Sequence, residues 1–123
     1  MAAPVWGSVG TATGGSSDTV TITAPASIAD NDILLAILRC DPNTQVITPP
    51  TGFTSIARIP WTGGIFALEV FWKRAASESG NYVFTETGNS WGDGAMLRIS
   101  GAITTGDPSD VVGADNIGSS TSA

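Results

Sequence analysis

An all-β fold is predicted for this chain: an antiparallel β-sandwich, jelly-roll-like or Ig-like, of about seven strands. Short apolar or alternating runs recur about every ten residues between turn-forming residues, which is the spacing of a sandwich or barrel. Glycine contributes 15 of the 123 residues, as expected for a fold with many turns. Charged residues make up only 13%, about half the usual share, whereas the exposed positions of a helical bundle need Glu and Lys.

The first half of the chain is expected to form three strands. They cover residues 5–13, 19–23 and 33–39. The first is weak and ends at the Gly-Gly-Ser-Ser run of residues 14–17. The second alternates, so Val20 and Ile22 point inward and its threonines point outward. The third is a continuous apolar run between two turn signals, and its length favours a central strand over a buried helix.

The second half is expected to add four strands, at residues 53–59, 65–73, 82–85 and 95–99. Residues 48–52 form a rigid loop, since neither of its two prolines can donate to a strand ladder. Gly63-Gly64 is typical of a hairpin turn. Segment 65–73 alternates, with Ile65, Ala67, Glu69, Phe71 and Lys73 on one of its faces. The face expected to point to the core consists of Phe66, Leu68, Val70 and Trp72.

Domain organisation is simple. We expect a sandwich domain over residues 1–112, which is long enough for a core of its own. Residues 113–123 are expected to be a flexible tail, or a linker into strands outside this sequence. No basic and apolar leader typical of a secretory signal is visible, and the longest apolar run, 33–38, is too short for a membrane span. The chain is therefore expected to be made in a cytoplasm.

The charge balance and the missing histidine narrow the function classes. Five basic against 11 acidic residues give a formal charge of −6, which argues against nucleic-acid and membrane partners. With no histidine, the usual general base and metal ligand are absent. The single cysteine, Cys40, is expected to be a small buried hydrophobe; the alternative is a reactive thiol, which no histidine could activate. We expect no enzyme activity and no cofactor.

Acidic residues are the remaining candidates for a chemical site. Glu69 and Glu86 could pair as catalytic carboxylates, but a solvated surface position is expected for both. Asp30-Asn31-Asp32 and the 107–110 segment could supply calcium ligands, although these residues are first of all turn formers. The 90–94 segment contains a Gly-Asp-Gly turn without a phosphate-cradling pattern. No catalytic, cofactor-binding or metal-ligating residue is assigned.

Tryptophans are the main candidates for an interface or ligand site. Trp72 is expected to be structural, in the middle of a strand on the core face. Trp61 and Trp91 lie beside turns, where they could cap the open ends of the sandwich, pack at an interface or stack on a sugar ring. Trp6 in the first strand is a third candidate.

Several segments resemble a β-sandwich domain that recurs in bacteriophage tail, fibre and head-decoration proteins and in some bacterial surface proteins. The matching segments are 24–36, 47–53 with its Thr-Pro-Pro-Thr-Gly-Phe sequence, 68–75, 82–84, 97–101 and 107–110. Their order and spacing agree over roughly residues 5–115. Phe53 stands where the family commonly has tryptophan, and such domains usually continue with strands beyond the last segment. The resemblance implies a fold and carries no catalytic motif.

Together these features predict a non-enzymatic structural protein of a bacteriophage virion. Its partners would be other virion subunits in a homo-oligomer, trimeric or of higher copy number, and its location a capsid decoration, a head fibre or the tail. The alternative is an adhesive carbohydrate-binding module that uses loop aromatics, with a glycan as its ligand.

Overall fold

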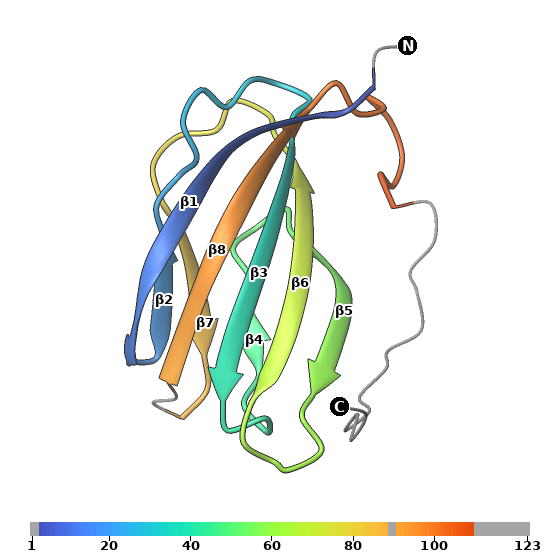
Figure 1. The fold of residues 1–123 in the computed structure, drawn as a ribbon. Helices are drawn as coiled ribbons and strands as arrows, with labels where there is room; N and C mark the ends of the chain where they lie inside the picture. The colour runs from blue at the N-terminus through green and yellow to red at the C-terminus, as the bar shows by residue number, and fades with distance from the viewer. Residues whose placement is uncertain (1–2, 89–90, 110–123) are drawn as a thin grey trace, which may run out of the picture.

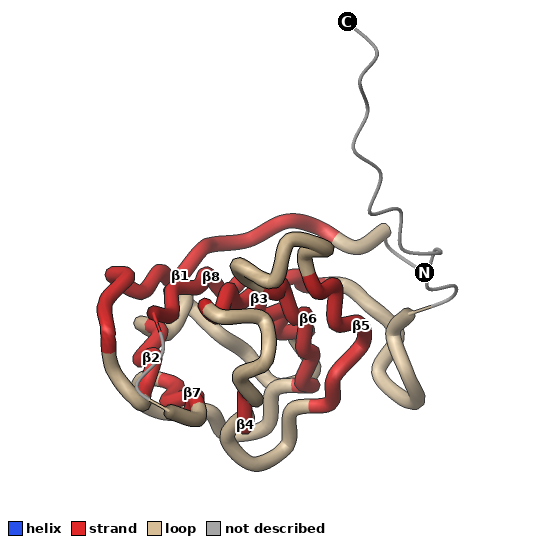
Figure 2. The backbone as a smooth tube through the Cα atoms, turned by 90° about the horizontal axis from the view of Figure 1, so that it is seen from below, coloured by secondary structure: helices blue, strands red, loops and turns tan. Residues whose placement is uncertain are grey.

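Eight strands form two antiparallel sheets that pack face to face, so the predicted all-β sandwich is confirmed (Figure 1). The computed structural model describes residues 3–88 and 91–109. A five-stranded sheet has the order β1-β8-β3-β6-β5, and a three-stranded sheet has the order β2-β7-β4. Figure 2 shows the two layers seen along the strands. The strands are β1 (Val5–Ser16), β2 (Thr19–Ile22), β3 (Ile33–Asp41), β4 (Ile47–Thr48), β5 (Thr54–Pro60), β6 (Ala67–Arg74), β7 (Tyr82–Glu86) and β8 (Trp91–Ser100).

The strand pairing is jelly-roll-like. β1 pairs with β8, β2 with β7 and β3 with β6, as in a long hairpin whose two arms are rolled up together. The innermost pair of that hairpin would be β4 with β5. Here β5 instead pairs with β6 and extends the first sheet, which leaves three strands in the second.

All seven expected strands occur, with differences at three places. β1 continues through the glycines expected to end it, because Gly15 and Ser16 still pair with the start of β8 after a bulge. β8 begins at Trp91, four residues before the expected start at Ala95. β4 was not expected, since two residues followed by Pro49 are too few to show a period.

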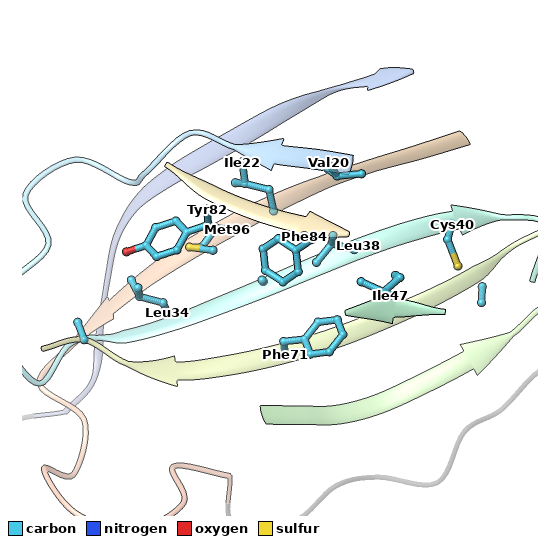
Figure 3. Packing of buried hydrophobic residues seen from close by; sticks show 13 residues of the cluster. Val20, Ile22, Leu34, Leu38, Cys40, Ile47, Phe71, Tyr82, Phe84 and Met96 are labelled. Carbon is cyan, nitrogen blue, oxygen red and sulfur yellow. The ribbon is translucent and has the colours of Figure 1, made fainter. Parts of the chain in front are cut away.

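The hydrophobic core lies between the sheets (Figure 3). Its largest fully buried side chains include Phe71, Phe84, Leu34, Leu38 and Met96. Val20 and Ile22 point inward as predicted. The core residues labelled in Figure 3 come from β2, β3, β4, β6, β7 and β8.

The prediction for the core face of β6 is wrong. The buried face carries Ala67, Glu69 and Phe71, and the face with Trp72 points away from the second sheet. Phe71 lies opposite Ala36, which has no exposed surface. Because β6 is apolar on both faces, its period of two did not say which face the second sheet would cover.

Candidate functional site

The outward surface of the five-stranded sheet carries apolar side chains on all five of its strands. We call it the outer face; it faces the viewer in Figure 1, with β2, β7 and β4 behind it. Strand register and alternation place there the apolar side chains Trp6, Val9, Leu35, Ile37, Ala57, Ile59, Leu68, Val70, Trp72, Trp91, Ala95, Leu97 and Ile99. A half-solvated antiparallel sheet normally carries polar residues on this side.

Several of these side chains are well exposed. The exposed fraction is 36% for Ile37, 37% for Leu68, 43% for Val9 and 57% for Trp6. A shallow groove of about 390 Å³ crosses β1, β8, β3 and β6 between them. Its lining includes the small side chain of Ala95, which lies opposite Ile37. Contiguous exposed apolar surface of this kind is typical of an interaction site.

The charges on the outer face balance. Arg39 and Arg74 supply two positive charges and Asp41 and Asp93 two negative ones, so the formal charge of −6 lies elsewhere in the chain. Arg39 bridges both aspartates, with N–O distances of 3.3 Å to Asp41 and 3.7 Å to Asp93. Arg74 donates to the backbone carbonyl oxygens of Ile103 and Gly106 and so ties the 101–109 segment to one corner of the face.

An aromatic cluster borders the opposite end of the outer face, at the β5–β6 hairpin. Trp61 stacks on Phe66, with ring centroids 5.6 Å apart and planes at 13°. The guanidinium of Arg39 lies 5.5 Å from the centroid of the Phe66 ring, a cation–π distance. The hairpin turn itself uses Gly64, whose φ of 75° is costly for residues with a Cβ. The cluster therefore joins the hairpin to the charged pairs of β3 and β8.

The structure places the three candidate tryptophans on or beside this one surface. Trp91 opens β8 next to Asp41, at the same end of the sheet as Trp61. Trp6 lies at the other end, opposite Ile99. Trp61 and Trp91 are 43% and 48% exposed.

Trp72 is not on the core face, contrary to the prediction. It lies on the outer face opposite Leu35 and Thr54, and it is half-buried by its neighbours in the sheet.

Glu69 and Glu86 are not solvated, which corrects the expectation for both. Glu69, 8% exposed, accepts hydrogen bonds from Arg58 at 2.7 Å and from the Ser55 hydroxyl at 2.9 Å. Glu86 is 2% exposed, and its carboxylate lies against the Cα of Gly92, where a Cβ would come within 2.6 Å of both oxygens. Glu69 lies at the base of a hollow of about 230 Å³ next to Arg58 and Gln45, whereas Glu86 is enclosed between the sheets.

Cys40 is buried, as predicted. Burial raises the pKa of its thiol, although Arg58, which donates to the sulfur at 3.7 Å, acts in the opposite direction. The thiol donates in turn to the carbonyl oxygen of Gln45, at 3.8 Å. A protonated, enclosed thiol is a packing group rather than a nucleophile.

The aspartates of the expected turns are engaged as turn formers. Asp32 accepts from the backbone N–H of Ala29 at 2.9 Å and lies 3.4 Å from Nε of Arg98. Asp30 accepts from the N–H of Ser77, and Asn31 has a φ of 73°, a value that Asn tolerates in turns. Asp107 accepts from Ser109, and these hydrogen bonds lower its pKa. Within residues 3–88 and 91–109, no three acidic, Cys or His residues are placed to hold a metal ion.

Some predictions fall outside the described residues: those for Ser90, for Asp110 and for the 113–123 tail. No helix in the described part of the chain is long and apolar enough to cross a membrane.

The predictions from sequence missed the outer face itself, with Ile37, Leu35 and Leu97 at its centre. A signal for it was present. β3 is apolar at consecutive positions, and β6 carries large apolar residues on both faces, a pattern of strands covered on both sides. Comparison with known proteins adds no relative: no protein-family model, no curated protein and no solved structure matches this chain.

Proposed function

We propose that this chain is a non-enzymatic structural subunit of a bacteriophage virion that binds neighbouring subunits through its outer face. The observation that carries the proposal is the apolar and charge-balanced outer face on an otherwise acidic chain. Leaving Ile37, Leu68 and Trp6 in water forgoes the free energy of burying them, roughly 25 cal/mol per Å² of apolar surface. A neighbouring subunit that covers this face would recover that free energy.

The architecture and the sequence resemblance supply the viral context. Jelly rolls occur in viral capsid domains and in lectins, so the strand pairing supports both candidate functions by analogy. The resemblance of segments such as 47–53 and 68–75 to phage tail, fibre and decoration domains favours the virion.

A non-enzymatic role is supported by where the reactive groups lie. Glu69 is held by Arg58 and Ser55, and the thiol of Cys40 is enclosed. General acid–base and nucleophilic catalysis need such groups within reach of a substrate.

Carbohydrate binding is the alternative, and the exposed pair Trp61 and Trp91 at one end of the sheet favours it. Sugar-binding aromatics offer a free ring face to the sugar. Trp61 keeps only one such face, since Phe66 covers the other.

Immunogold electron microscopy tests the proposal, using an antibody against this chain and intact particles of the phage that encodes it. Label on the capsid or the tail is the expected result, and particles without label would overturn the proposal. Phage carrying Ile37→Asp should lose the label, because a carboxylate at the centre of the outer face opposes burial. Phage carrying Val83→Asp is the matched control and should keep it. Val83 is a similarly exposed β-branched residue on β7, outside the outer face.

A glycan array tests the alternative. Binding that is lost in both Trp61→Ala and Trp91→Ala, together with unlabelled particles, would replace the virion proposal by the carbohydrate-binding function. A blank array together with labelled particles supports the virion proposal.

A further inference from the structure

We infer that the partner of the outer face is the outer face of a second copy of this chain, so that the protein forms a two-fold, sheet-on-sheet dimer. This inference deepens the proposed function by naming the first subunit that the surface binds. The resulting interface would be isologous, with the same residues contributed by both copies.

The area of the face suits such a dimer. β3 pairs with β6 over eight residues, and five strands lie side by side. With strands about 4.8 Å apart and about 3.4 Å per residue, the face covers roughly 600 Å² in projection, before side-chain relief is counted. Two copies would bury about 1,200 Å² or more, which reaches the size of specific and stable interfaces.

The charge of the outer face is compatible with binding a second copy of the chain. A two-fold contact sets a surface against itself, so a surface with net charge would repel its own copy. The outer face has no net charge on a chain of formal charge −6, since Arg39 and Arg74 balance Asp41 and Asp93, and it therefore does not repel its own copy. Arg39 is already paired with Asp41 and Asp93 of its own copy, so it needs no acidic partner from the second copy.

The position of Ile37 makes the inference specific. β3 is the middle strand of the five, and Ile37 is the middle residue of β3 (Figure 1). A two-fold axis through the centre of the face therefore brings Ile37 opposite Ile37 of the second copy. The groove at Ala95 lies beside it and would receive side chains from the other sheet.

Sedimentation velocity on the full chain, over a concentration series up to about 100 µM, tests the inference. The wild type should show a concentration-dependent dimer. Ile37→Asp and, separately, Leu68→Asp should weaken dimerisation by roughly a hundredfold or more, since each places two like charges in a dry contact. Val83→Asp should dimerise like the wild type. Circular dichroism checks that each variant is folded. Because two separate outer-face variants are used, the test still holds if one of them fails to fold.

The outcomes separate this inference from the proposed function. A wild type that stays monomeric throughout the series, or outer-face variants that dimerise as Val83→Asp does, would overturn the second-copy inference. If the second-copy inference fails but phage particles are labelled, the virion function still stands, and a different subunit covers the outer face. A dimer that depends on Ile37, in a protein absent from particles, would support the inference and overturn the virion function.

Discussion

Arg58 of β5 holds together the polar corner of the interior, next to Glu69 of β6. Its guanidinium pairs with Glu69 at 2.7 Å and donates to the carbonyl oxygens of Asn43 and Gln45 in the β3–β4 connection. Ser55 adds a hydrogen bond to the same carboxylate. A buried carboxylate is stable only with such partners, so one arginine determines whether this corner can be closed.

Arg58→Ala should lower the free energy of unfolding by about 2–3 kcal/mol, because it removes the positive charge paired with Glu69 and the guanidinium donor to two carbonyl oxygens. The loss should be smaller than for a fully buried ion pair, since the Arg58 side chain keeps 29% exposure. Urea denaturation of dilute protein measures the change. Arg39→Ala, at the exposed pairs with Asp41 and Asp93, is the control and should cost under about 1 kcal/mol. Equal losses in the two variants would contradict the role given to Arg58.

At the scale of elements, the close crossing of β1 and β2 joins the two sheets along one edge. The N–H of Thr23 donates to the carbonyl oxygen of Thr11 at 3.3 Å. Gly10 permits the approach, since a Cβ there would lie 1.7 Å from the carbonyl oxygen of Thr23. The first strand can thus belong to the five-stranded sheet and still contact the other layer.

Gly10→Ala should therefore push β1 away from β2 and lower the free energy of unfolding by about 2–3 kcal/mol or more. Gly63→Ala is the matched control. Its Cβ would meet the movable side chain of Trp61, at 3.2 Å, in the exposed hairpin. The control should stay within about 0.5 kcal/mol of the wild type in the same denaturation experiment. A Gly10→Ala protein as stable as the control would show that the crossing is not tight.

On the scale of the whole molecule, the chain combines general self-repulsion with one surface suited to self-association. Its formal charge of −6 keeps copies apart at low ionic strength. The outer face has no net charge and large exposed side chains such as Trp6 and Ile37. Burial of these apolar side chains would then act against a repulsion that comes from the rest of the surface.

Dimerisation should consequently strengthen with salt. Raising NaCl from about 20 mM to about 200 mM shortens the Debye length from about 20 Å to under 10 Å and should tighten the dimer several-fold. Sedimentation at the two salt concentrations measures the change. Ile37→Asp should remain monomeric at both. Weaker dimerisation at high salt would instead indicate that ion pairs between copies hold the interface.

Seven of the eight strands and the class of fold follow from local signals in the sequence. Alternation at Val20 and Ile22, turn chemistry at Asp30-Asn31-Asp32 and the Gly63-Gly64 pair are local signals, and each marked its element correctly. The tertiary structure alone decided which face of β6 is buried, because Phe71 and Trp72 are both large and apolar and only the second sheet distinguishes them. It likewise decided that Trp6 and Trp91 share one surface with Trp61 beside it, since strand order joins residues that are far apart in the chain. Local periodicity is set by the backbone, whereas the choice between two apolar faces depends on which surfaces the remaining strands can cover.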